Sequence, residues 1–216
     1  MKTLSVLVKR NAKIYFQDKG LFLTSLITPL ILLVLYGTFL RKVYEDSFRQ
    51  VLTAAGIQIS DKILAGCVGG QLFSSMLAVS CVTVAFCSNL VMVQDKVTGA
   101  RRDLTISPVK DSTLALGYYF ATLLSTLIVC LTALGVCFVY LAITGWCLRL
   151  VDVAAVLLDV ILLVLFGTAL SSCILFPMST QGQASGVGTI VSSGYGFICG
   201  AYMPISSFSK GLPNVV

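Results

Sequence analysis

Residues 160–209 have the sequence VILLVLFGTALSSCILFPMSTQGQASGVGTIVSSGYGFICGAYMPISSFS, which contains no Asp, Glu, Lys, Arg or His. Three other runs, residues 21–40, 63–94 and 112–148, also lack charged residues. A helix needs about 20 apolar residues to cross the hydrocarbon core of a bilayer, and each run reaches that length. The four runs together predict an all-α membrane protein.

The overall composition supports this prediction and excludes several kinds of chemistry. Hydrophobic residues make up 57% of the chain and charged residues 11%, against about 45–50% and about 25% in soluble domains. There is no histidine, and Glu45 is the only glutamate, which excludes H-E-x-x-H zinc hydrolysis and Ser-His-Asp hydrolysis. The eight cysteines form no C-x-x-C pair, as is typical of small buried hydrophobes. We therefore predict no catalytic site, no metal and no cofactor in this chain.

The longest uncharged run must contain more than one helix, because a continuous helix over residues 160–209 would be about 75 Å long. Pro177, Gly182 and Pro204 are the expected breaks. The sequence predicts a single transmembrane domain over residues 1–216, with polar connectors at 41–62 and 94–111. Its five predicted spans are residues 21–40, 66–93, 114–144, 153–176 and 183–203.

The N-terminal segment, residues 2–19, mixes positive charges with apolar residues at helical spacing, such as Leu4, Leu7 and Ile14. This pattern favours a helix lying in the headgroup plane, and the alternative is a solvated basic tail. With the N-terminus inside, nine Lys and Arg residues are cytoplasmic and six are external. That excess predicts a multi-pass protein of the cell membrane with a cytoplasmic N-terminus. Because the net charge of +6 lies in short connectors, nucleic acid is not an expected partner.

The connector at 94–111 is the most informative polar segment. Its charged residues Arg101, Arg102 and Asp103 precede the apolar Leu104 and Ile106, which gives an amphipathic pattern. The proline after Ser107 disfavours helical geometry at that serine and so ends the helix. A short rigid helix here would transmit a push from a cytoplasmic partner to the spans on both sides. The alternative is an ordinary charged turn.

The pattern Asp95-Lys96-x-x-Gly99, followed by Leu104-x-x-Ser107-Pro108 and later by Leu116-Gly117, resembles the type-2 permeases of ATP-binding cassette (ABC) exporters, the ABC-2 type. A late segment, residues 200–205 followed by Leu212-Pro213, is similar to the end of the fifth span in that family. Gln94 and Val97 replace charged residues of the family pattern. The resemblance assigns ATPase coupling to Asp95, Lys96, Gly99, Arg101, Arg102, Leu104, Ser107 and Pro108.

The resemblance also implies partners. Members have six spans, so a further span is expected beyond this chain's five. Two permease subunits, forming a homodimer or a heterodimer, line the path across the lipid bilayer, and a separate cytoplasmic ABC ATPase subunit binds ATP. The present chain contains no G-x-x-x-x-G-K-[ST] loop.

Several features leave alternatives open. The G-x-x-x-G pairs Gly182/Gly186 and Gly196/Gly200 permit close helix packing, either within the subunit or between subunits. Asp159 lies in the fourth predicted span, where an acid needs a partner or a position near water. A lipid, a drug-like molecule or a peptide is compatible with the apolar, Ser- and Thr-containing spans. A secondary transporter or a channel, not driven by ATP, is the alternative function.

Overall fold

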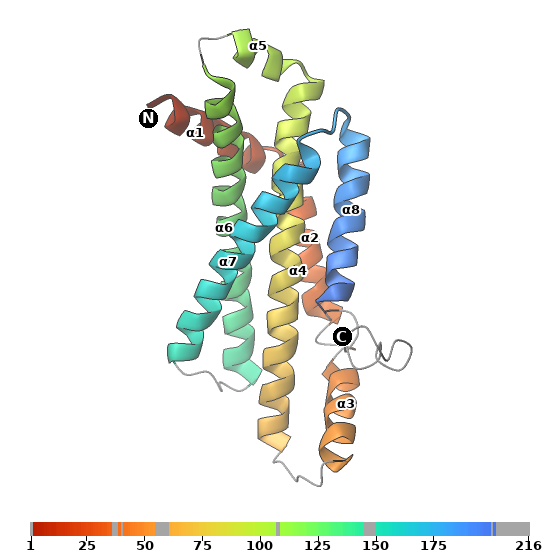
Figure 1. Ribbon diagram of the computed structural model, residues 1–216. Coiled ribbons are helices and arrows are strands. Elements are labelled where there is room, and N and C mark those ends of the chain that lie inside the picture. Colours follow the sequence, from red (N-terminus) through yellow and green to blue (C-terminus); the bar gives the residue numbers. More distant parts are fainter. Residues whose placement is uncertain are drawn as a thin grey trace.

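The computed structural model describes residues 2–35, 39, 41–54, 61–106, 109–144, 150–199 and 201. All regular structure in these residues is helical, which confirms the all-α prediction. The helices, in chain order, are α1 (Lys2–Gln17), α2 (Lys19–Leu35), α3 (Arg41–Ala54), α4 (Asp61–Val97), α5 (Ala100–Ile106), α6 (Asp111–Thr144), α7 (Leu150–Leu175) and α8 (Gln181–Ile198). Figure 1 shows α1 and α5 at one end of the bundle and α3 at the other.

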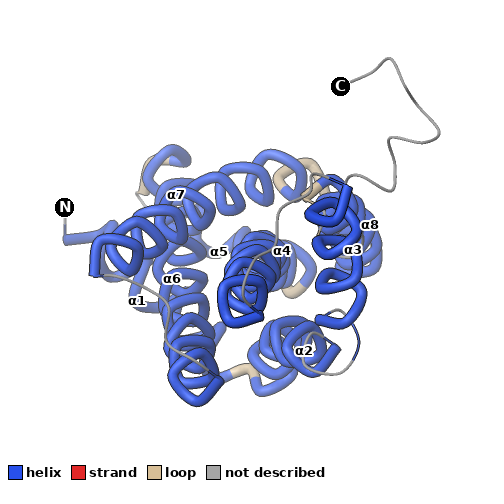
Figure 2. Tube along the Cα trace, turned by 90° about the horizontal axis from the view of Figure 1, so that it is seen from below, coloured by secondary structure: helices blue, strands red, loops and turns tan. Residues whose placement is uncertain are grey.

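Helix α4 is the central element of the fold. Viewed along the bundle, α4 lies in the middle with α2, α6, α7 and α8 around it (Figure 2). Its sequence is apolar on all sides rather than on one stripe, and such a helix is buried by its neighbours. The main core cluster joins four helices. Its buried members are Tyr15 of α1, Leu77, Cys81, Val84 and Val91 of α4, Val129, Cys130 and Leu134 of α6, and Val160 and Val164 of α7.

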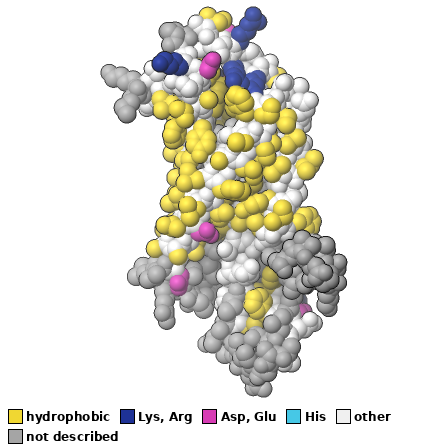
Figure 3. Space-filling model, in the orientation of Figure 1, with side chains coloured by type: hydrophobic (Ala, Val, Ile, Leu, Met, Phe, Trp, Pro, Cys, Tyr) yellow, Lys and Arg dark blue, Asp and Glu magenta, His cyan; other side chains and the backbone are white. Residues whose placement is uncertain are grey.

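The described residues contain three helices that are long and apolar enough to cross a membrane, within α4, α6 and α7. A fourth span is counted if α1 and α2, which meet at an angle of 74°, form one broken span. On the face drawn in Figure 3, a broad band of hydrophobic side chains covers the middle of the molecule. Lys and Arg side chains gather at the end that carries α1 and α5. The placement of α1 in the headgroup plane, and spans at α2 and α8, stay predictions.

The polar connector predicted at 41–62 contains a helix, α3, which was not predicted from the sequence. Arg41 bonds Glu45 one turn later at 2.9 Å, and Tyr44 and Phe48 pack against the first turns of α4. Burial raises the pKa of the Tyr44 hydroxyl. Helix α4 has 37 residues, or about 55 Å at about 1.5 Å per residue, and exceeds the hydrocarbon thickness of about 30 Å. At least one end of α4 therefore extends beyond the membrane core.

The longest uncharged run is broken between α7 and α8, where the sequence predicts a break. Helix α7 ends at Leu175, and Pro177 lies in the turn that follows, as predicted. Gly182, the predicted lower boundary of the next span, lies in the first turn of α8, which begins one residue earlier at Gln181. The helix begins there because the Thr180 side chain accepts a hydrogen bond from the backbone N–H of Gln183 and caps it. Pro204, the third expected break, lies outside the described residues.

Candidate functional site

Asp95 lies where α1, α4 and α6 meet, on the last turn of α4. The Arg10 guanidinium of α1 donates to both of its carboxylate oxygens, at 2.5 and 3.3 Å. The Tyr118 hydroxyl of α6 donates to the same carboxylate at 2.6 Å. Only 5% of Asp95 is exposed. Asp95, which the resemblance assigns to ATPase coupling, is therefore a buried residue that connects α4 to α1 and α6.

The neighbouring Lys96 points to a different part of the fold. Its ammonium group donates to the backbone carbonyls of Phe176 and, at 3.1 Å, of Met178, both in the turn after α7. The same ammonium lies 5.3 Å from the centre of the Phe176 ring, and the Arg101 guanidinium lies 5.5 Å from it. Consecutive residues at the end of α4 thus connect that helix to α1 and α6 and to the turn between α7 and α8.

Gly99 forms the bend between α4 and α5. Its φ of +83° lies in the left-handed region, which glycine adopts without steric cost. The backbone N–H of Arg102 donates to the Gly99 carbonyl at 2.8 Å and starts α5. Leu104 packs against the core cluster that includes Met92 and Leu114, so α5 is anchored on one side.

The other side of α5 is open. None of its residues is buried, and Ile106 is 77% exposed. Arg102 and Asp103 are exposed as well. The predicted site residues Ser107 and Pro108 lie outside the described residues. Helix α5 therefore presents a short amphipathic surface at the end of the bundle, between the two long helices α4 and α6 (Figure 1).

A groove of about 310 Å³ lies between α2, α4 and α8. Three threonines in its wall donate to carbonyls of their own helices, namely Thr24 to Gly20, Thr83 to Val79 and Thr189 to Ser185. Their lone pairs remain as acceptors. The described lining residues carry hydroxyl, thiol and apolar groups and no charge: Thr24, Thr83, Phe86, Cys87, Leu90, Ala184, Ser185, Gly188, Thr189, Ser192 and Ser193.

Comparison with protein-family models gives a match over residues 2–214 to the model described as ABC-2 type transporter. The chain belongs to this family. No curated protein and no solved structure matched it. The match confirms the resemblance seen in the segment from Asp95 to Gly117 and shows that the chain is a membrane component of an ABC-2 type transporter, not its ATPase. The coupling roles of individual residues stay predictions.

The glycines predicted to pack helices of this ABC-2 type transporter lie on different faces of α8. Gly196 is buried, whereas Gly182 and Gly186 are exposed, and a Cβ at either would meet no atom within 4 Å. Gly200 lies outside the described residues. The stripe that α8 buries consists of small residues four apart: Ala184, Gly188, Ser192 and Gly196. Among the three described glycines of these pairs, only Gly196 is buried inside the subunit.

Neither Asp159 nor the polar hollow beside α3 forms part of a binding site among the described residues of this ABC-2 type chain. Asp159 is exposed on α7 and is not among the lining residues of the groove.

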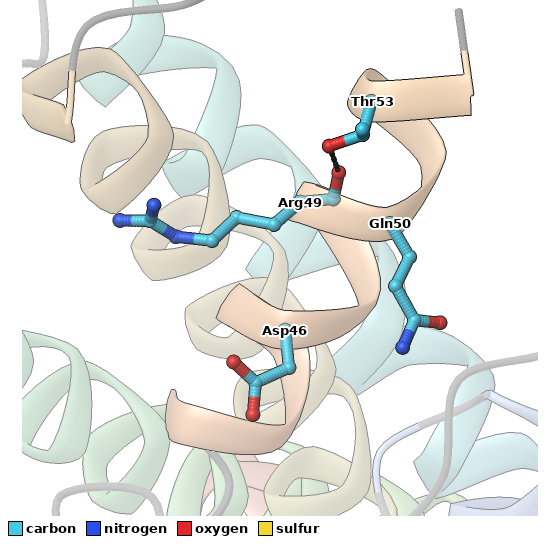
Figure 4. Close-up of a pocket in the computed structure, with 4 residues that line it drawn as sticks. All are labelled: Asp46, Arg49, Gln50 and Thr53. Carbon is cyan, nitrogen blue, oxygen red and sulfur yellow. Dashed lines mark hydrogen bonds between the residues drawn. The ribbon is translucent and has the colours of Figure 1, made fainter.

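At the end of the bundle that carries α3, a shallow hollow of about 540 Å³ is lined by Asp46, Arg49, Gln50 and Thr53 (Figure 4). All four belong to α3, and the Thr53 hydroxyl donates to the Arg49 carbonyl at 2.7 Å. Within the described part of the chain, the lining of this hollow comes from α3 alone. Among the described residues, no cluster could hold a metal ion.

Proposed function

We propose that this chain is the permease subunit of an ABC exporter, which works with a second permease subunit and a separate cytoplasmic ATPase that binds ATP. The observation that carries the proposal is α5, a short exposed helix held between α4 and α6 by the Gly99 bend and the Leu104 contact. Its basic residues Arg101 and Arg102 lie at the end of the bundle where positive charge gathers (Figure 3). Positive charge marks the cytoplasmic side.

The proposed mechanism is mechanical. The ATPase docks on α5 and displaces it when ATP binding closes the two ATPase subunits. Because Asp95 bonds both Arg10 and Tyr118, the ends of α1, α4 and α6 move together rather than separately. A rigid connection of this kind passes a small displacement into packed helices, which have discrete arrangements rather than continuous ones.

Reversing one exposed charge on α5 tests the docking surface. We expect Arg102→Glu to weaken the association with the ATPase about tenfold or more, because like-charge juxtaposition across an interface is costly. Two quantities are measured on the purified permease in nanodiscs: the amount of ATPase that remains bound to it, and the rate at which this bound ATPase hydrolyses ATP. Lys42→Glu is the matched control, since Lys42 is an exposed cation on α3 at the opposite end. Equal ATPase binding by the two variants would contradict the docking role.

We infer that the groove between α2, α4 and α8 is part of the substrate path. Its described lining residues combine apolar side chains with hydroxyl groups and carry no charge, which suits an amphipathic substrate such as a lipid or a drug-like molecule. A secondary transporter or a channel is the alternative. Transport by the reconstituted chain that needs no ATP and no ATPase would favour that alternative.

Filling the groove tests this path. Thr189→Trp places a large ring in the groove, whereas Ile190 is 72% exposed and does not line it, so Ile190→Trp is the control. Amphipathic compounds that raise the unfolding temperature of the wild-type protein should bind Thr189→Trp at least about tenfold more weakly, because the ring occupies their site. Equal stabilisation of both variants would show that the compounds bind elsewhere.

A further inference from the structure

The turn between α7 and α8 lies at the same end of the bundle as α5 (Figure 1). Helix α7 stops at Leu175, and the carbonyls of Phe176 and Met178 follow its last turn. The final carbonyls of a helix and of the turn after it have no partner within the helix, so they need donors from elsewhere. Both carbonyls receive them from the Lys96 ammonium group.

The chemistry of Lys96 suits this position. An ammonium group has three donors and can serve two carbonyls at once. Its positive charge also interacts favourably with the negative end of the α7 dipole. The Phe176 ring adds a second attraction, because it lies within 6 Å of both Lys96 and Arg101 and has a negative face. The turn is therefore bound to Lys96 of α4 and Arg101 of α5, which lie 80 and 75 residues before Phe176 in the sequence.

The position of this turn determines where α8 begins. Thr180, only two residues after Met178, caps α8 through the N–H of Gln183 at 3.4 Å. From there α8 packs its small-residue stripe on α4, where Gly188 would place a Cβ 3.4 Å from the Phe86 ring. The same helix supplies six described residues of the groove wall: Ala184, Ser185, Gly188, Thr189, Ser192 and Ser193. A displacement of the turn would thus change the groove.

We propose that Lys96 is a positioning residue that fixes the α7–α8 turn to the coupling segment, so that movement of α5 is transmitted to α8 and to the groove. This inference rests on the proposed coupling role of α5. The Asp95 contacts transmit movement to α1 and α6, whereas the Lys96 and Arg101 contacts carry it to the opposite side of α4. Through Lys96, the movement driven by the ATPase therefore also reaches α8, which forms part of the groove wall.

Hydrogen exchange of the purified chain in nanodiscs tests the connection itself. We expect the backbone amides of Phe176 and Met178 to exchange about tenfold faster in Lys96→Met than in the wild type, because the turn loses two charge-assisted hydrogen bonds. Lys96→Arg, which keeps the charge and the donors, should restore most of the protection. Lys110→Met, at an exposed lysine of the same segment, should change nothing. Wild-type exchange rates in Lys96→Met would overturn the inference, whether or not an ATPase partner exists.

A second measurement tests transmission in the complex with the ATPase. In the wild type, trapping ATP should alter exchange in both α5 and residues 181–198 of α8. In Lys96→Met the α5 response should remain and the α8 response should fall at least about fivefold, while Lys96→Arg should recover it. A full α8 response in Lys96→Met would overturn the inference. An absent α5 response in the wild type would instead contradict the proposed function.

Discussion

The Asp95→Ala protein is expected to lose about 1.5–3 kcal/mol of unfolding free energy, the range for hydrogen bonds that involve a charged group. The carboxylate is 5% exposed and receives bonds from Arg10 and Tyr118, so its removal disconnects α1 and α6 from the end of α4. The Arg10 side chain keeps access to water, with 33% of its surface exposed, which limits the loss. We also expect ATP hydrolysis and transport to become uncoupled in this variant.

Reversible unfolding of the purified protein in mixed micelles measures the loss. Asp103→Ala is the control, because Asp103 is an exposed acid on α5 eight residues further on. Tyr118→Phe removes one hydrogen bond from the same carboxylate and should cost about 1 kcal/mol. If Asp95→Ala were no less stable than Asp103→Ala, the contacts of Arg10 and Tyr118 with Asp95 would not hold these helices together.

Gly167→Val should cost about 3 kcal/mol or prevent folding, because α7 and α4 are in backbone contact at this residue. A Cβ at Gly167 would lie 3.3 Å from the Cys81 carbonyl oxygen and 3.3 Å from the Val82 Cα. Main-chain atoms cannot turn aside as a flexible side chain can, so the helices must separate and lose packing. Small residues at such crossings are what permits close approach between membrane helices.

The matched control is Gly135→Val on α6. Gly135 is exposed, and an added Cβ would meet nothing within 4 Å of the described structure. Both substitutions put the same β-branched residue into a long apolar helix, so the change in helix propensity is the same in both and cancels when the two variants are compared. The quantity to compare is the yield of folded protein after extraction together with its unfolding free energy. Equal values for the two variants would mean that α7 does not approach α4 as closely as the structure places it.

Much of the fold follows from where charges are missing. Most of α4 and α6 coincides with the uncharged runs 63–94 and 112–148, because backbone polar groups in lipid must bond within a helix. Helix α7 overlaps its run only from residue 160 and begins earlier, across Asp152 and Asp159. Helix α3 does not follow from the absence of charge, because Arg41, Glu45 and Arg49 make its segment polar. The four-residue spacing of Tyr44 and Phe48, on one helical face, was the signal that predicts it.

The candidate site was harder to predict, since its contacts join distant parts of the chain. The resemblance located Asp95 and Lys96, but their partners Arg10 and Phe176 lie 85 and 80 residues away. Neither sequence position has a local pattern that reveals the pairing. Helix α8 shows a related limit: its many glycines and serines surround the helix, so periodicity could not tell that Gly188 faces inward and Gly186 outward.

A photo-reactive amino acid at Arg102 tests the proposed coupling most directly. Illumination of intact cells should join this position on α5 covalently to a P-loop ATPase, identified by mass spectrometry of the adduct. The same group at Lys42 of α3 should give no such product, since that helix lies at the opposite end of the bundle. An ATPase adduct from Lys42 and none from Arg102 would contradict both the orientation and the role of α5.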